Sequence, residues 1–369
     1  MYKRQVVNTM NHRKESFDTE YDAKATLDAA RHSTIHVQAV HPEDNVGTNL
    51  ADELTPLNYY TILSDEEPAS VYTNANLRSF YITQPLQINM ENDSLHMRFY
   101  SPVGIKEVTV MAKSPTMDEY VEFVYIDDIP AFADIKTSIK VLEKGLYRTE
   151  SGKVLQFSAE EMNPASLSLK IACNDPYWTK ISQIKAKWYI KFVLNGGNPV
   201  TGTPNKNWWG IRPVHCREAV ALFLNIGYMC TLEKFQQRVS TFQGTFLDNN
   251  KYPVDTSTLI SRLENLSGFD IGLIYSGNGV SGLGGGRTWG VYQKSFLYHY
   301  ENSGGCCSTI FHELGHCLGY NHNSTMTYGQ WASGCADVFY KNNIKDFPVN
   351  SHTILKSRSN PNILSLIHI

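Results

Sequence analysis

The sequence lacks several features that would assign it to a class of protein at once. It contains no apolar run of about 18 residues, so no segment is predicted to cross a bilayer. The formal charge of the 369 residues is only −3, which indicates neither nucleic acid nor an anionic membrane as a partner. No internal repeat or low-complexity tract is visible, so nothing indicates a repeat architecture.

Cysteine is present, but not in the spacing of a thiolate metal site. No Cys-x-x-Cys pair occurs, which argues against a zinc–thiolate site and against a thioredoxin-type motif. Disulfides and buried free thiols both remain open, and Cys306 and Cys307 could form either. The seven cysteines are Cys173, Cys216, Cys230, Cys306, Cys307, Cys317 and Cys335.

The composition is that of a globular protein with room for about two domains. Hydrophobic residues make up 42% of the chain, and the 21 tyrosines accompany many Asn, Thr and Ser residues. This balance favours a β-rich bacterial protein that is extracellular, attached to the cell surface or periplasmic.

Both ends of the chain resemble translated sequencing adapter. Residues 1–5, MYKRQ, and residues 364–369, LSLIHI, match the two reading directions of a transposase end sequence. We therefore expect both segments to be artefacts, and we interpret residues 6–52 as a weakly structured upstream remnant. The lack of a signal region then carries no argument about localisation.

Residues 53–178 have the pattern of an all-β domain. Short segments rich in Val, Ile, Phe, Tyr and Thr alternate with Pro, Gly, Asn and Asp about every ten residues. This spacing predicts an antiparallel sandwich, and we expect an immunoglobulin-like domain. The predicted strand segments are RSFYITQPLQINM (78–90), SLHMRFYS (94–101), KEVTVMAK (106–113), YVEFVYI (120–126) and LSLKIAC (167–173).

Residues 179–363 have a mixed pattern, which makes the predicted fold class of the whole chain α+β. Hydrophobic periodicity predicts strands within 184–194 and 269–277, and helices over 216–228, 232–242 and 308–319. Ser308 is the expected N-cap of the last helix. The glycine-rich stretch 280–293 predicts a loop followed by a strand, and is therefore not a nucleotide-binding fingerprint.

Four further residues are interpreted as structural. His215 and His299 are isolated in the sequence, so we expect hydrogen-bonded structural histidines rather than ligands. Trp208 and Trp209 are expected to pack against the domain, although a role in lining a substrate surface is the alternative.

The stretch HELGHCLGYNHNSTMTYG concentrates the chemistry. His312 and His316 are four residues apart, so on a helix both imidazoles project from one face and can bind one cation. Glu313 can reach a water at the same cation, and Gly319 tolerates positive φ where the helix must stop. The turn there would return His322 as a third nitrogen ligand. Three neutral nitrogens with an open fourth position predict one catalytic Zn²⁺, against the alternative of a core helix with hydrogen-bonded histidines.

The pattern H-E-x-x-H-x-x-G-x-x-H resembles the zinc signature of the metzincin clan of metallopeptidases. The resemblance implies that His312, His316 and His322 are zinc ligands and that Glu313 is the general base. It also implies a metzincin-like catalytic domain, with a twisted mixed sheet and a zinc-binding helix, after the immunoglobulin-like domain.

The next residues, STMTYG, resemble the metzincin turn that puts a methionine under the metal, which implies that role for Met326. The Met-x-Tyr pair is similar to the astacin and serralysin families, so Tyr328 is a candidate fifth ligand or transition-state donor, with simple packing as the alternative. Only three residues separate His322 from Met326, fewer than in either family.

The glycine-rich stretch also resembles the metzincin edge strand that pairs with an extended substrate. By that resemblance Gly282, Leu283, Gly284 and Gly285 would bind the peptide through their backbone, and a flexible loop is the alternative.

The sequence therefore predicts a secreted zinc-dependent endopeptidase that hydrolyses a protein or glycoprotein with a zinc-activated water and Glu313 as general base. The main alternative is a β-sandwich adhesion or binding protein that carries an inactive metallopeptidase-like domain, and the intact motif argues against it. A zinc hydrolase with a non-protein substrate is disfavoured by Gly319 and His322. Neither a nucleic-acid partner nor a transmembrane segment is expected.

Overall fold

The chain consists of two units in the computed structural model, and each is described by itself. The structure describes residues 7–8, 13–14, 37–38, 58–139, 141, 143–194, 196–199, 201–299 and 306–350. Unit 1 comprises Met1–Leu27, Leu63–Gln84 and Lys180–Ile369, and unit 2 comprises Asp28–Ile62 and Pro85–Thr179. Our expectations for residues 1–5, for nearly all of 6–52 and for 364–369 lie outside the described residues. The predicted domain boundaries stay a prediction.

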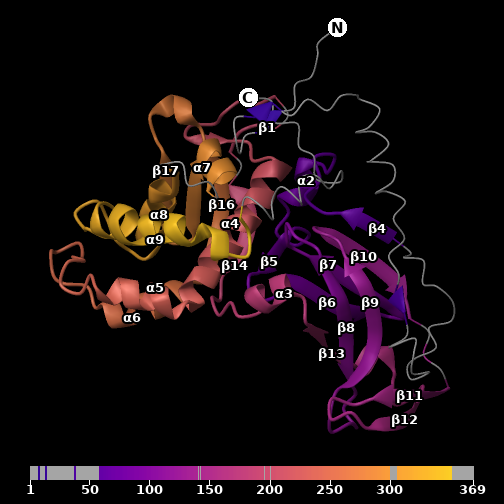
Figure 1. The fold of residues 1–369 in the computed structure, drawn as a ribbon. Helices are drawn as coiled ribbons and strands as arrows, with labels where there is room; N and C mark the ends of the chain where they lie inside the picture. The colour runs from indigo at the N-terminus through magenta and orange to yellow at the C-terminus, as the bar shows by residue number, and fades with distance from the viewer. Residues whose placement is uncertain are drawn as a thin grey trace. The chain divides into compact units, whose positions relative to one another are not determined.

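Unit 2 contains two four-stranded antiparallel sheets and a small hairpin (Figure 1). The first sheet has the order β4 (Asn58–Thr61), β10 (Ala133–Ser138), β7 (Ser94–Phe99) and β6 (Leu86–Glu91). The second has the order β13 (Ser168–Cys173), β8 (Ile105–Lys113), β9 (Val121–Ile129) and β3 (Val37–Gln38). The hairpin is β11 (Lys144–Arg148) with β12 (Val154–Ser158), and η1 (Pro164–Ser166) is a short 3-10 turn.

The strands of unit 2 form because their sequences alternate. In β7, Leu95, Met97 and Phe99 are buried while the residues between them are partly exposed, which is the period of two that a half-buried strand requires. The prediction of antiparallel strands is confirmed in this region, whereas the immunoglobulin-like assignment stays a prediction. One predicted segment, 78–90, is corrected: it contains two strands of different sheets, because Pro85 lacks the N–H that a continuous ladder needs.

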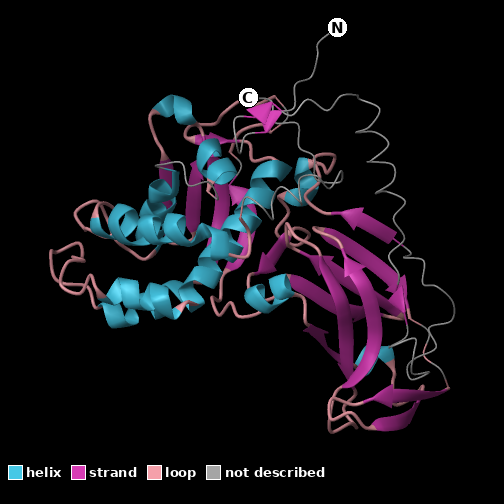
Figure 2. Cartoon of the chain, in the orientation of Figure 1, coloured by secondary structure: helices cyan, strands magenta, loops and turns pink. Residues whose placement is uncertain are grey.

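Unit 1 is built on a mixed sheet (Figures 1 and 2). Its three central strands are parallel, and an antiparallel strand lies at each edge. The order is β17 (Gly282–Gly285), β18 (Thr288–Tyr292), β16 (Gly268–Ile274), β14 (Tyr189–Leu194) and β5 (Ser79–Tyr81), and β15 (Trp208–Trp209) pairs with β16. Two short strands, β1 (Val7–Asn8) and β2 (Arg13–Lys14), pair with one another.

Helix is concentrated in unit 1, as the cyan segments of Figure 2 show. The helices are α2 (Ala69–Tyr72), α4 (Pro213–Thr231), α5 (Glu233–Ser240), α6 (Thr256–Glu264), α7 (Gln293–Tyr298), α8 (Cys306–Cys317) and α9 (Val338–Asn343), with 3-10 turns η2 (Ser276–Asn278) and η4 (Ile344–Asp346) and the π-helical segment η3 (Gln330–Asp337). The chain passes from unit 2 to unit 1 within α3 (Pro176–Ile181). Among the described residues, none of these helices is long and apolar enough to span a membrane.

The helix predictions are partly corrected. α4 extends beyond the predicted 216–228 in both directions: Pro213 suits the first turn of a helix, and because nearly all of the residues are buried, an apolar stripe does not mark where the helix begins and ends. α6 and α7 were not predicted. Ser308 is not the N-cap of α8, because the helix already begins at Cys306.

The core of unit 1 is an aromatic cluster between α4 and the sheet. Phe223 of α4 stacks on Phe269 of β16 at a centroid distance of 4.8 Å and meets Trp289 of β18 edge-on at 5.0 Å. Trp188 meets Phe269 at 5.3 Å, and all four side chains are fully buried. Such offset and edge-on pairs add to the free energy of burial, so this cluster holds α4 firmly against the sheet.

Candidate metal centre

The C-terminal half of helix α8 carries two imidazoles and a carboxylate. It packs against β17 and β18 on one side and against η3 on another. Ile310, Phe311 and Leu314 are fully buried and fix the helix in place. His312 and His316 are only half-buried, one helical turn apart, so their rings remain available to a ligand.

The helix ends in a Schellman motif at Gly319. The Gly319 N–H donates to the His316 carbonyl at 2.9 Å, and the Tyr320 N–H donates to the Gly315 carbonyl at 3.1 Å. Gly319 has a φ of +91°, which is the left-handed conformation that this motif requires. The predicted helix stop is thus present, and the chain turns back at this point towards the two imidazoles.

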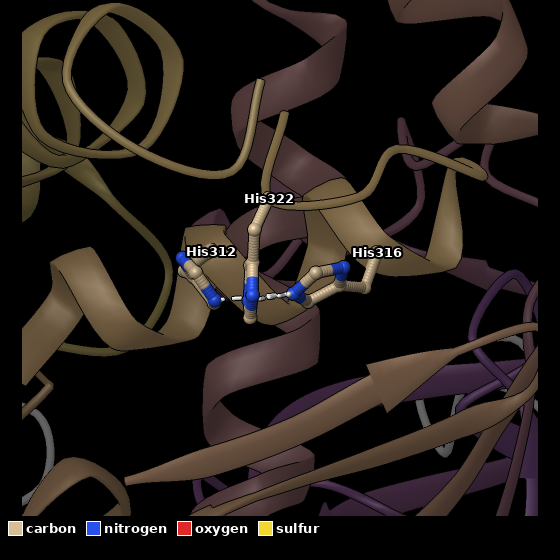
Figure 3. Close-up of side chains that lie close together, drawn as sticks. All are labelled: His312, His316 and His322. Atoms are coloured by element: carbon tan, nitrogen blue, oxygen red, sulfur yellow. Dashed lines mark hydrogen bonds between the residues drawn. The ribbon is translucent and has the colours of Figure 1, made fainter. Parts of the chain in front are cut away.

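The three histidines converge (Figure 3). The Nε2 atom of His316 lies 3.1 Å from that of His312 and 3.0 Å from that of His322. One nitrogen from each ring lies within 4.8 Å of the others, so the group could hold a metal ion. Three nitrogens about 2.0–2.1 Å from one tetrahedral ion are about 3.3 Å apart, so the observed spacing fits a small cation with little adjustment.

Hydrogen bonds at the far side of two rings indicate where the lone pairs point. The Nδ1–H of His316 donates to the Tyr320 carbonyl at 2.7 Å, and the Nδ1–H of His312 donates to the Thr327 carbonyl. In a neutral imidazole the other nitrogen is then an acceptor. The Nε2 lone pairs of His312 and His316 therefore face one another, which is an arrangement that a shared cation stabilises.

The protonation of the cluster also suits a metal. Burial lowers the pKa of His312 to about 4, and the neighbouring imidazoles act in the same direction. Burial likewise lowers the pKa of His316 below its ordinary value. Both rings are neutral at pH 7, and the neutral imidazole is the form that binds metals.

Glu313 lies beside the point of convergence. Its Oε1 is 3.9 Å from His312 Nε2, and the residue is almost fully buried. Burial raises the pKa of this carboxyl group to about 8. A nearby positive charge favours the ionised form, so Glu313 can act as a base at neutral pH only beside a cation.

The glycines of β17 make room for this carboxylate. A Cβ at Gly282 would lie 2.2 Å from Glu313 Oε1, and one at Gly284 would lie 2.4 Å from the Glu313 carbonyl oxygen. β17 is therefore an ordered strand packed directly on α8, rather than a flexible loop. Leu283 is half-exposed and Gly285 has open space at its Cβ position.

The short turn after His322 lies against α8. Met326 is fully buried, and a Cβ at Gly315 would meet the Met326 carbonyl oxygen at 2.4 Å. Thr327, whose carbonyl holds His312, donates from its hydroxyl to Asn321 O at 3.2 Å. Neither Gly315 nor Thr327 was predicted from the sequence to have a role, although the glycine inside the H-E-x-x-H helix was a usable signal, since glycine in a helix interior usually has a packing reason.

Tyr328 is beside the cluster and exposed. Its ring centroid is 4.5 Å from that of His312 and 5.3 Å from that of His322, and 55% of the residue is accessible to solvent. The ring therefore borders the site from the solvent side, and its catalytic role stays a prediction.

The remaining residues that the sequence singled out lie elsewhere. His215 accepts a hydrogen bond from the Arg212 N–H at 3.2 Å, and His299 Nδ1 is 3.0 Å from the Tyr340 hydroxyl. Trp208 and Trp209 are half-buried in β15. Five cysteines are free thiols, namely Cys173, Cys216, Cys230, Cys317 and Cys335, while the side chains of Cys306 and Cys307 lie outside the described residues.

No protein-family model matches the chain, and no curated protein or solved structure is significantly similar to it. The residues of the centre themselves are therefore the basis for assigning a function.

Proposed function

We propose that this protein is a secreted, zinc-dependent endopeptidase of the metzincin type. The observation that carries the proposal is the convergence of His312, His316 and His322, with a buried glutamate 3.9 Å from the nearest ligand nitrogen. Three neutral imidazoles that leave a coordination position open are typical of a catalytic rather than a structural zinc site. The metzincin-like and immunoglobulin-like assignments of the two parts of the chain belong to this proposal.

The chemistry divides between the ion and the chain. A zinc ion held by three imidazoles would supply Lewis acidity and lower the pKa of an adjacent water to about 7. Glu313 would accept the proton of the attacking water at its carboxylate and deliver it to the leaving amine. Tyr328, at the solvent side of His312, would donate its hydroxyl proton in a hydrogen bond to the oxyanion.

The sheet edge supports a peptide as the substrate. β17 is the last strand in the order of the unit 1 sheet as described, and it lies directly on α8. An extended peptide that added to this edge would pair with the backbone of residues 282–285. Because Gly282 and Gly284 contact Glu313 without an intervening side chain, the paired peptide would run past the carboxylate.

The test is to substitute the base and keep the ligands. Glu313→Ala and the near-isosteric Glu313→Gln are expected to bind zinc as the wild type does, because the three histidines are unchanged. Cleavage of an unstructured protein such as casein should fall by about 10²- to 10⁴-fold, the usual contribution of a general base. Tyr328→Phe in the same assay should lower kcat with little change in KM.

Two outcomes would contradict the proposal. If the wild type binds no zinc, the metal centre is wrong. If Glu313→Gln cleaves as fast as the wild type, Glu313 is not the base. A wild type that binds zinc and cleaves no protein would favour the alternative of an adhesion protein with an inactive peptidase-like domain.

A further inference from the structure

The loop of residues 245–252, far upstream in the sequence, is hydrogen-bonded to the turn that carries His322. Asn249 makes two hydrogen bonds with this turn: its Nδ2 donates to the Gly319 carbonyl at 3.1 Å, and its Oδ1 accepts from the Asn321 N–H at 2.7 Å. These two peptide groups lie on either side of Tyr320. One side chain therefore uses both ends of its carboxamide to fix the backbone between the end of α8 and His322.

The two bonds affect both ligands at this end of the site. The carbonyl of Tyr320 accepts the Nδ1–H of His316 at 2.7 Å, so the orientation of that ring depends on the peptide that Asn249 brackets. His322 directly follows Asn321, and it is exposed. An exposed side chain has little packing of its own to fix it, so its position depends on the backbone that Asn249 holds.

Hydrogen bonds within the loop and at its base fix its conformation. Asp248 closes it, because its Oδ1 accepts from the N–H groups of Asn250 and Tyr252 at 2.8 and 2.9 Å. At the base of the loop, Leu247 exchanges two hydrogen bonds with Thr325, at 2.8 and 3.1 Å.

The loop is also anchored in the core. Phe246 is fully buried, and its ring meets Trp331 edge-on at a centroid distance of 5.9 Å. Trp331 in turn donates its indole N–H to the Phe311 carbonyl in α8 at 3.2 Å. The loop and the metal-binding helix are thus connected through one buried aromatic contact, and Asn249 is held in register with α8.

We infer that Asn249 is a positioning residue of the metal centre, which sets the orientation of His316 and the location of His322 through the turn at Gly319–Asn321. The inference rests on the proposed metal centre. It also accounts for the short connection between His322 and Met326: the bonds from the 245–252 loop fix the turn from outside, so the connection needs no further residues to define its path.

The test compares two neighbouring asparagines. Asn249→Ala removes both hydrogen bonds, whereas Asn249→Asp keeps the acceptor for the Asn321 N–H and loses the donor to Gly319. Asn250→Ala is the matched control, because the side chain of Asn250 is exposed and makes no hydrogen bond among the described residues. The zinc dissociation constant is measured by chelator competition, and the visible spectrum of bound Co²⁺ reports the coordination geometry.

We expect Asn249→Ala to weaken zinc binding by about tenfold or more, in the range found for outer-shell partners of metal ligands, and to change the Co²⁺ spectrum. Asn249→Asp should lie between Asn249→Ala and the wild type, and Asn250→Ala should match the wild type. Thermal unfolding of the metal-free proteins detects any general loss of folding.

Equal zinc affinity and equal Co²⁺ spectra for Asn249→Ala and Asn250→Ala would overturn the inference. So would a lower unfolding temperature of Asn249→Ala with an unchanged spectrum, since a merely structural residue gives that result. Both readouts are independent of cleavage. A protein that binds zinc without hydrolysing peptides would therefore contradict the proposed peptidase and leave the role of Asn249 standing, whereas a wild type that binds no zinc would overturn both.

Discussion

Each unit contains a cluster of polar side chains that includes histidine, and the histidine partners differ: carboxylates in unit 2, and backbone carbonyls and other imidazoles in unit 1. In unit 2, His96 lies between two carboxylates: its Nδ1 is 2.7 Å from Glu91 Oε1, and its Nε2 is 2.7 Å from Asp134 Oδ1. Arg98 and Lys136 complete this His96 cluster by binding Asp134 and Glu91. In unit 1, no carboxylate lies within hydrogen-bonding distance of the described ring nitrogens of the three histidines, which instead meet backbone carbonyls or one another.

This difference shows what separates an ion-pair cluster from a metal site. Both nitrogens of His96 have acidic partners, and the hydrogen bond with Asp134 in particular raises the pKa of His96, which favours the imidazolium form. The charges of that cluster are satisfied by its own members. The three histidines of unit 1 have no such acidic partner among the described residues, and burial lowers the pKa values of His312 and His316, so this group could accept a cation from outside the chain. The partners of the ring nitrogens, rather than the number of histidines, therefore distinguish the candidate metal site from the ion-pair cluster.

The most direct test of this difference removes one histidine from each cluster and measures zinc binding. His316→Ala leaves two ligands, and we expect zinc affinity to fall by more than the roughly 10- to 100-fold loss typical of outer-shell changes. His96→Ala should bind about one zinc ion per chain, which is also the expectation for the wild type. Metal content after dialysis against a weak chelator measures both. A loss of zinc in His96→Ala alone would reverse the assignment.

A smaller effect is expected where the unit 1 cluster depends on close packing. In Gly282→Ala the new Cβ would lie 2.2 Å from Glu313 Oε1, so the carboxylate must move. Displacing a reacting group by about 1 Å costs roughly 100-fold in rate, and zinc binding should be retained because the ligands are untouched. Measurements of kcat and of bound zinc test this expectation. Asn89→Ala, an exposed change beside Glu91 in the His96 cluster, is the control and should alter neither value.

The smallest effect concerns the dependence of unfolding on pH. The folded-state pKa of His96 is raised, so its contribution to stability is complete below the unfolded value of 6.5 and is lost as the pH rises through the folded value. The folded-state pKa of Glu91 is lowered to about 2, mainly by the hydrogen bond from Lys136, so its contribution is complete above 4.5 and is lost as the pH falls towards 2. The cluster should therefore stabilise unit 2 most between these two unfolded values.

Urea unfolding of the wild type and of His96→Gln at several pH values measures this contribution. The difference in the free energy of unfolding should be on the order of 1 kcal/mol near pH 5.5, because solvent screens a partly exposed network. It should decrease at both higher and lower pH. A difference that grows with rising pH would contradict the raised pKa of His96.

The sequence predicts those features of the centre that depend on residues close together in the chain, and it does not predict contacts between distant segments. The shared face of His312 and His316 follows from helix geometry, and the stop at Gly319 follows from the conformational freedom of glycine, so both were accessible from the sequence. The hydrogen bonds of Asn249 were not, because they join segments about 70 residues apart and no pattern in the sequence of the loop indicates which residues it contacts. The sequence singled out Gly282 only as part of a substrate-binding strand, and the close approach of Gly282 to Glu313 and of Gly315 to Met326 depends on how α8 packs against β17 and against the turn.

The strand predictions follow the same rule. Alternation identified the strands of unit 2, but it could not show that β5 leaves its neighbour β6 to pair with β14 in unit 1. The helices α6 and α7 were missed because they are short, and a short helix has few residues in which periodicity can be recognised.

The two hydrogen bonds of Asn249 would couple metal binding at the proposed centre to folding. The three ligands lie close together in the sequence, so even an unfolded chain could gather them weakly around an ion. Asn249 contributes only when the two distant segments are docked, and it therefore strengthens binding to the native state alone. By thermodynamic linkage, each tenfold gain in native-state affinity is returned as about 1.4 kcal/mol of stability when the metal is saturating. At the proposed metal centre, the hydrogen bonds of Asn249 would thus make the stability of the protein depend on the concentration of free metal.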